Sequence, residues 1–209
     1  MVSIDKIKMI LWDFDGVILD SMSVRDDGFR EVLKEYPNDL VDRLIKYHRE
    51  NGGLSRYVKF RYFFEEILNK DISEDQVNDL ANSFSAIMIK RLVSPENLIQ
   101  DSLNFVKDNC ETILMHIVSG SDHDELNFLC KAFGIDGYFN SINGSPTPKN
   151  ILVKNIVDKS NFIKTEIVLI GDSINDYDAA VDNGILFFAY NNPELKDDHI
   201  YIRSFTEIQ

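Results

Sequence analysis

The sequence has few cysteines and no long apolar run. Two cysteines, Cys110 and Cys130, among 209 residues are too few for a disulfide framework. No apolar run approaches the ~20 residues that span a bilayer. The alternation of apolar and charged side chains over residues 1–9 does not fit a secretory signal. We therefore expect a cytoplasmic protein that is not bound to a membrane.

Basic residues are also scarce, with 22 Lys and Arg against 35 Asp and Glu and a formal net charge of −13. Nucleic-acid binding and anionic membrane surfaces both require clustered basic side chains, so neither partner is expected. A G-x-x-x-x-G-K-[ST] motif is missing, which excludes a P-loop NTPase. An anionic substrate would need a bound cation or a local basic group to offset the overall field.

What is present is an alternation of short apolar runs with amphipathic helical patterns. The runs predict strands over residues 9–13, 113–119, 138–142, 167–171 and 185–190. Helices are predicted to begin near Ser94-Pro95, Ser121, Thr147-Pro148 and Ser173. Strands that alternate with single helices favour a doubly wound parallel sheet, that is, an α/β Rossmann-like fold.

One stretch interrupts this alternation. Residues 24–35, 39–50, 55–69 and a segment from residue 74 read as four consecutive amphipathic helices, the last introduced by Ser73 and Gln76 at capping-box spacing. We expect an α/β core of residues 1–20 and 94–209 and an inserted helical cap of residues 21–93. Ligands of open α/β sheets bind beyond the carboxyl ends of the strands, so this cap should cover the binding site.

Two carboxylates end the first predicted strand. Asp13 and Asp15 fall on the same side of an extended backbone, where like charges raise the pKa of one of them. Turn chemistry explains a single Asp-Gly pair, and a divalent cation is the main alternative for two carboxylates together.

A second acidic cluster favours the cation. Asp172 and Asp176 follow the predicted strand 167–171, and parallel strands end at one edge of a sheet. Helix capping explains either residue alone, but not a second cluster at a second strand end. Oxygen ligands of this kind are typical of Mg²⁺, which often shares its coordination shell with a substrate phosphate.

Two further strand ends carry groups suited to an anion. Ser119, Gly120 and Ser121 place hydroxyl and backbone N–H groups at a predicted helix start, which is also an ordinary N-cap pattern. Lys149 lies in the first turn of a predicted helix, where the helix dipole disfavours a cation unless an anion accompanies it. An exposed, solvated lysine is the alternative.

These residues resemble the four motifs of the haloacid dehalogenase superfamily, in the correct order. DFDGV from Asp13 resembles the first motif, Ser119 in VSGS the second, Lys149 in TPK the third and GDSIND from Gly171 the fourth. The inserted helices match the cap position of the phosphoglycolate-phosphatase-like branch. The resemblance covers roughly residues 8–20 and 95–205.

The resemblance implies a phosphoric monoester hydrolase that acts on a small phosphorylated metabolite, either a sugar phosphate or a phospho-acid. Asp13 would attack phosphorus, and Asp15 would protonate the leaving alcohol and then activate water. Mg²⁺ would be bound by Asp13, the Asp15 backbone carbonyl and Asp172. Asp176, a further catalytic residue, would either bind Mg²⁺ directly or support its ligands. Gly16, Ser119 and Gly120 would bind the phosphoryl oxygens, and Lys149 would hold the Asp13 carboxylate and the developing charge. Dehalogenases lack the carboxylate at the Asp15 position, so its presence favours phosphate esters.

The cap is expected to select the alcohol. Arg56 and Lys59 share a helix face beside Gly52-Gly53, and they could bind a second anionic group of the substrate, such as a carboxylate. Salt bridges to Glu65, Glu66 or Asp75 are the alternative use of these cations.

Three other functions remain open at this point. A phosphomutase of the same superfamily, similar to β-phosphoglucomutase, would carry the same four motifs. A receiver domain also phosphorylates an aspartate in a parallel sheet, but the helical insert and the Asp13–Asp15 pair argue against it. A non-catalytic phospho-ligand binding protein would not need all the chemical positions filled. We expect a monomer or a small homo-oligomer.

Overall fold

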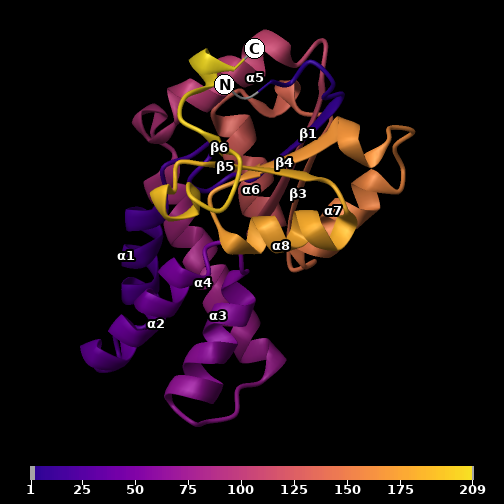
Figure 1. The fold of residues 1–209 in the computed structure, drawn as a ribbon. Coiled ribbons are helices and arrows are strands. Elements are labelled where there is room, and N and C mark those ends of the chain that lie inside the picture. The colour runs from indigo at the N-terminus through magenta and orange to yellow at the C-terminus, as the bar shows by residue number, and fades with distance from the viewer. Residues whose placement is uncertain (1–2, 209) are drawn as a thin grey trace.

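A six-stranded parallel sheet forms the centre of the molecule (Figure 1). The computed structural model describes residues 3–208, so Met1 and Val2, which belong to the expected core segment, and Gln209 lie outside the described residues. The sheet order is β3-β2-β1-β4-β5-β6, and every neighbouring pair is parallel. The strands are β1 (Met9–Trp12), β2 (Leu114–Asp122), β3 (Ser141–Ser145), β4 (Ile167–Gly171), β5 (Leu186–Tyr190) and β6 (Tyr201–Ile202). The predicted α/β class is confirmed.

The central strands agree best with the sequence. Every residue of β1 and β4 is buried, as expected for continuous apolar runs between two helical layers. Strand β2 runs three residues further than predicted, so the N-cap of the next helix is Asp122 and not Ser121. Edge strand β3 begins later than predicted because residues 136–138 form a 3₁₀ turn, and β6 was not predicted.

Helices cover both faces of the sheet. Alternate residues of β1 point to opposite sides, so that Met9 and Leu11 join one hydrophobic cluster while Ile10 and Trp12 join the other. The first side is covered by α7 (Lys149–Val157) and α8 (Ile174–Asn183), and the second by α5 (Gln100–Asn109) and α6 (His123–Ala132). A 3₁₀ turn at Pro95–Asn97 precedes α5, where the sequence predicted that helix to begin.

The remaining helices form a lobe of their own. They are α1 (Met22–Val32), α2 (Asn38–Glu50), α3 (Arg56–Tyr62) with a π-helical turn (Phe63–Ile67), and α4 (Glu74–Leu92). Helix α4 begins with the capping box predicted at Ser73 and Gln76. Phe29, Phe60 and Phe84 are buried against one another inside the lobe, with ring centroids 4.5 to 6.2 Å apart. These contacts give the lobe its own small aromatic core.

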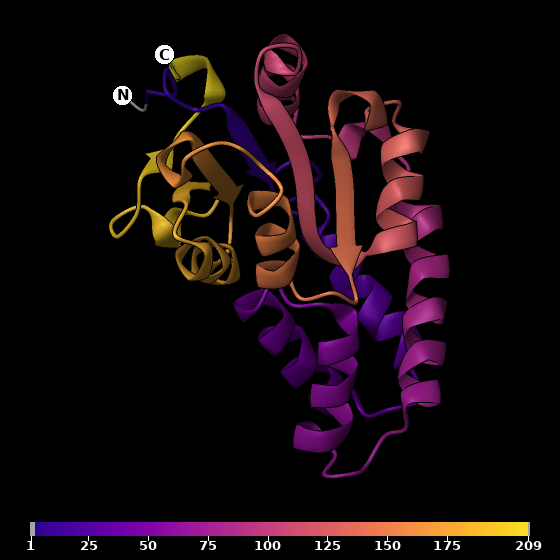
Figure 2. The ribbon, with the colours of Figure 1, turned by 90° about the vertical axis from the view of Figure 1, so that its right-hand side faces the viewer.

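The helical lobe lies at the carboxyl end of the sheet. Figure 2 shows α1–α4 beneath the arrowhead of β3, on the opposite side from the two termini. The fit to the core is close, since a Cβ atom on Gly120 of β2 would lie 2.4 Å from the carbonyl oxygen of Gly53. A core with a helical cap is therefore confirmed, whereas the exact boundaries at residues 20/21 and 93/94 stay a prediction.

Candidate active site

Asp13 lies directly after β1 and forms a buried ion pair with Lys149. The Nζ atom of Lys149 is 2.8 Å from Oδ1 of Asp13, and it also pairs with Asp176. Burial and the charge of Asp176 raise the pKa of Asp13 to about 7, although Lys149 opposes the shift. Burial lowers the pKa of Lys149, but its two carboxylate partners outweigh that effect and raise it above its ordinary value. The lysine in the unfavourable first turn of α7 thus has anionic partners.

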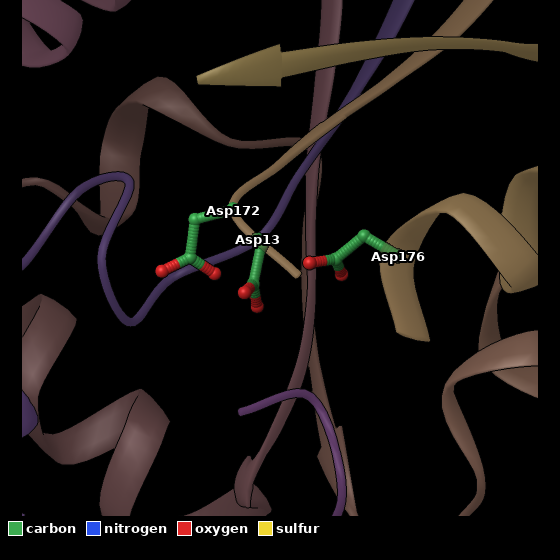
Figure 3. A group of neighbouring side chains, drawn as sticks. All are labelled: Asp13, Asp172 and Asp176. Carbon is green, nitrogen blue, oxygen red and sulfur yellow. The ribbon is translucent and has the colours of Figure 1, made fainter. Parts of the chain in front are cut away.

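Three carboxylates gather at this edge of the sheet. Asp13, Asp172 after β4 and Asp176 in α8 each offer one oxygen, and these oxygens lie within 4.8 Å of one another (Figure 3). Burial and the charge of Asp13 raise the pKa of Asp172 well above its ordinary value. One lysine cannot balance three carboxylates at this range, so the cluster fits a hard divalent cation.

Asp176 differs from the other two because both of its oxygens already accept hydrogen bonds. Oδ1 pairs with Lys149, while Oδ2 accepts from the backbone N–H of Ser173 at 3.1 Å and from its hydroxyl at 2.6 Å. The carboxylate is fully buried. It therefore orients Lys149 and the start of α8, whereas Asp13 and Asp172 are freer to bind an ion.

Gly16 makes room for Asp172. A Cβ atom on Gly16 would lie 2.0 Å from Oδ2 of Asp172, and its φ of +78° favours glycine independently. The side-chain amide of Asn191 donates to its carbonyl oxygen at 2.9 Å. Gly16 is needed here for the first and fourth motifs to come together.

The side chain of Asp15 is not one of the three clustered carboxylates and contacts residues of the cap and of β2. Its Oδ1 accepts hydrogen bonds from the hydroxyl of Ser21 and from Nε of Arg25, the latter at 2.7 Å, and its Oδ2 accepts from the hydroxyl of Ser121. Burial raises the pKa of Asp15, but Arg25 and the two serines lower it to below its ordinary value. Asp15 is therefore held as a carboxylate by one residue of α1 and two hydroxyls.

Ser119 is buried in β2, one residue before the glycine that touches the cap. Its Oγ accepts a hydrogen bond from the backbone N–H of Ser121 at 3.1 Å. Gly120 is in backbone contact with Gly53, so the double glycine of the cap approaches the core itself. Gly53 also meets α8, where its Cβ would lie 2.7 Å from Cβ of Asn175.

A cavity separates the cap from the core. The cavity is narrow, and the core residues that line it include Asp15, Gly120 and Asp172. The cap lines it with cations and aromatic groups, namely Arg25, Phe29, His48, Arg56, Lys59 and Phe84. Cations of the cap thus face carboxylates of the core across the space where the sequence predicts a substrate.

The cap cations have partners that differ from those expected from sequence. Arg56 pairs with Glu125 of α6 at 2.5 Å, and not with Glu65, Glu66 or Asp75. The Nζ atom of Lys59 lies 2.9 Å from Nδ1 of His48 and 3.3 Å from the carbonyl oxygen of Gly52. Neither of these two partners of Lys59 is a carboxylate. Burial and the charge of Arg25 lower the pKa of Lys59 to about 7.

Sequence reasoning missed two of the most connected side chains. Arg25 and Glu125 are buried and linked to each other at 3.1 Å, yet 100 positions separate them in the chain. Arg25 reads as an ordinary polar residue of an amphipathic helix, and Glu125 as a first-turn acid that favours the helix dipole. No local signal marks their contact.

The fold and the site define a capped α/β protein with an acidic cluster at the carboxyl end of its parallel sheet. The chain belongs to the haloacid dehalogenase-like hydrolase family, whose family model matches residues 10–190. This match confirms the family, the fold and the hydrolase class predicted from the four motifs.

Individual relatives are distant in sequence. A protein of Thermotoga maritima named phosphorylated carbohydrates phosphatase is 21% identical over 183 residues, which cover 84% of this chain and 81% of the relative. CbbY of Rhodobacter sphaeroides, solved with xylulose-1,5-bisphosphate, shares the fold with a TM-score of 0.75 at 15% identity, with 96% of each chain covered. The HAD-hydrolase YfnB of Bacillus subtilis, solved with magnesium, has a TM-score of 0.67 at 17% identity, again with 96% of each chain covered.

Among residues 3–208, no helix is both long enough and apolar enough to cross a membrane.

Proposed function

We propose that this protein is a Mg²⁺-dependent phosphatase that hydrolyses a small phosphorylated metabolite through an aspartyl-phosphate. One observation carries the proposal: Asp13, the predicted nucleophile, is paired with Lys149 and lies in a carboxylate cluster beside a cation-lined cavity. The names of the Thermotoga phosphatase and of the ligand bound to CbbY support a phosphorylated sugar as the substrate class.

The first step forms the covalent intermediate. A carboxylate oxygen of Asp13 attacks phosphorus while the bond between phosphorus and the alcohol oxygen breaks. Asp15, in its acid form, gives its proton to the leaving oxygen. Lys149 stabilises the Asp13 carboxylate and the charge that develops on the phosphoryl oxygens. Ser119 and the N–H group of Gly120 bind those oxygens in this proposal, whereas the N–H group of Gly16 already donates to the carbonyl oxygen of Leu19 at 2.8 Å.

The second step releases phosphate. Asp15, now a carboxylate, takes a proton from a water molecule whose oxygen attacks phosphorus, and the bond to Asp13 breaks. The hydrogen bonds from Ser21, Arg25 and Ser121 favour the carboxylate form that this step needs. The first step needs the acid form, so we infer that an anionic substrate engages Arg25 and weakens its hold on Asp15.

Asp13 and Asp172 would bind the Mg²⁺ ion, together with the Asp15 backbone carbonyl, and Asp176 would support them through Lys149. The ion, when bound, would offset the negative charge of the attacking and transferred groups. The raised pKa values of Asp13 and Asp172 support this assignment, because burial and the neighbouring carboxylates disfavour their charged forms and a cation would relieve both effects.

Arg56 and Lys59 are proposed to bind a second anionic group of the substrate. Both are buried and line the cavity on its cap side. Lys59 supports this role most directly, since a buried cation without a carboxylate partner is costly to keep. The substrate would then carry its ester phosphate towards Asp13 and a further phosphate or carboxylate towards α3.

A panel of phosphate esters assayed with and without Mg²⁺ tests the proposed function. Release of inorganic phosphate from a sugar phosphate should need Mg²⁺ and should be lost in Asp13→Asn. An isomerised sugar phosphate as the main product would instead identify a phosphomutase. Turnover by Asp13→Asn at the wild-type rate would exclude the proposed nucleophile.

The remaining expectations concern the cellular context. Cys110 and Cys130 are free thiols, which supports a reducing, cytoplasmic location. We keep the proposal of a monomer or small homo-oligomer, for which light scattering on the purified protein is the direct measurement.

A further inference from the structure

Glu125 connects two arginines that the cap places over the cavity. It lies in the first turn of α6, in the core, and its side chain has no exposed area. Oε1 accepts a hydrogen bond from Nη1 of Arg25 at 3.1 Å, and Oε2 accepts one from Nη1 of Arg56 at 2.5 Å. One carboxylate of the core therefore holds one cation from α1 and one from α3.

Both arginines keep a buried donor group unused. Within residues 3–208, Nη2 of Arg25 and Nη2 of Arg56 are buried and have no hydrogen-bond partner. Leaving a buried charged donor unpaired costs free energy, and native proteins rarely tolerate it without a reason. Both side chains line the cavity, so an anion that widens the cavity as it enters would be placed to satisfy these two groups.

Other contacts fix the two guanidinium groups in place. Nη1 of Arg56 also donates to the hydroxyl of Ser85 at 2.6 Å, and its Cζ lies 4.6 Å from the ring centroid of Phe84. Nε of Arg25 is bonded to Asp15. Two buried cations on one wall would repel each other, and the carboxylate of Glu125 between them offsets that repulsion.

We propose that Glu125 is a positioning residue for substrate selection, which holds Arg25 and Arg56 so that their Nη2 groups bind a second anionic group. The ligand class is a phosphate ester that carries a further phosphate or carboxylate. This inference rests on the proposed function for the identity of the substrate, but recognition of the second anion can be measured without turnover.

A purely structural role for Glu125, as a tie between α6 and the cap, predicts a different result. Its loss would then lower stability without changing the choice between ligands. Removal of a negative charge from the cavity wall would, if anything, strengthen the binding of every anion. Loss of Glu125 should therefore weaken the binding of dianionic ligands if Glu125 is a positioning residue. If its role is purely structural, their binding should stay equal or become stronger.

Matched non-hydrolysable probes distinguish these roles. Alkane bisphosphonates and alkyl monophosphonates of equal chain length are titrated calorimetrically into the protein in the presence of Mg²⁺. The wild type should prefer the bisphosphonate, and Glu125→Gln should reduce that preference by about tenfold or more, as removal of one partner of a buried charge pair does. Glu125→Asp keeps the charge but cannot reach both arginines, so it should lose the preference too.

A double-mutant comparison shows whether Glu125 acts through its partner. In an Arg56→Gln background, Glu125→Gln should change the preference much less than it does in the wild type. Glu74→Gln is the matched control, because it breaks the exposed pair with Arg61 far from the cavity. An unchanged preference in both Glu125 variants, tighter bisphosphonate binding, or no preference in the wild type would overturn the proposal. Absence of turnover on all esters would instead refute the proposed function.

Discussion

Gly120 of the core and Gly53 of the cap lie so close that a Cβ atom on Gly120 would be 2.4 Å from the carbonyl oxygen of Gly53. A side chain on Gly120 would meet the backbone of the cap, and no rotation of a flexible side chain could relieve that contact. The two glycines therefore set how closely the cap covers the site.

Gly120→Ala should push the cap away from the core. We expect kcat/KM to fall by about tenfold or more, since displacements of about 1 Å can cost a hundredfold in a positioned site. Steady-state kinetics on the best ester from the panel measures the effect. Gly137→Ala is the matched control, because its Cβ would meet nothing within 4 Å. Equal rates for both variants would show that the close fit is not needed for activity.

Lys59→Met should stabilise the protein while it weakens substrate binding. The pKa of Lys59 is about 7 in the folded state and 10.5 ordinarily, so the unfolded chain binds the proton more tightly. The charged Lys59 side chain therefore destabilises the folded state most below pH 7, and this destabilisation disappears as the pH rises towards 10.5.

Thermal unfolding at several pH values tests this trade-off. Lys59→Met should raise Tm at pH 6 by at least about 2 °C, with a smaller gain at pH 9.5, while KM increases. Lys46→Met, at an exposed position of α2, is the control and should change neither. A lower Tm in Lys59→Met at pH 6 would mean that Lys59 is stabilising.

Lys149→Met should make the protein depend on a divalent cation for stability. Removal of the lysine leaves Asp13 and Asp176 without their buried partner, which costs about 3–5 kcal/mol. Millimolar MgCl₂ should raise Tm of the wild type, and raise it further in the variant, because the ion then meets less positive charge. Lys154→Met, which breaks an exposed pair with Asp158, is the control. If Mg²⁺ left Tm unaffected in every protein, the proposed metal site would be excluded.

Asp15→Asn should affect poor leaving groups most. An alkyl phosphate needs a proton on its leaving oxygen, and loss of a general acid typically costs about 10²–10⁴ in rate. A p-nitrophenyl ester needs no such proton, so its first step should stay fast while the intermediate can no longer be hydrolysed efficiently. A rapid burst of p-nitrophenolate equal to the enzyme concentration is therefore expected in stopped-flow measurements. If Asp15→Asn lowered the rate equally for both esters and gave no burst, the acid/base role of Asp15 would be contradicted.

The accuracy of the sequence-based fold prediction followed the burial of each strand. Strand β4 (Ile167–Gly171) has the predicted bounds, because a fully buried strand between two helical layers must be continuously apolar. Edge strand β3 reads Ser-Ile-Asn-Gly-Ser and carries no such pattern, so its start was misplaced. The two-residue β6 is too short to give any periodicity.

The motif residues could be predicted as one site because parallel strands end at the same edge of a sheet. Asp13, Lys149, Asp172 and Asp176 therefore come together whatever the details of packing. The orientation of the Asp15 side chain could not be predicted in this way. It depends on a guanidinium that only the folded cap brings within 2.7 Å.

The sequence by itself determined the α/β class, the helical insert and the acidic cluster, because these follow from local periodicity and from the order of motifs at strand ends. Only the tertiary structure decided which charges pair across the boundary between cap and core. Arg25, Arg56 and Glu125 lie far apart in the chain and look like ordinary helix residues. Their partnership results from how α1, α3 and α6 pack, which is a long-range property that no local pattern of residues encodes.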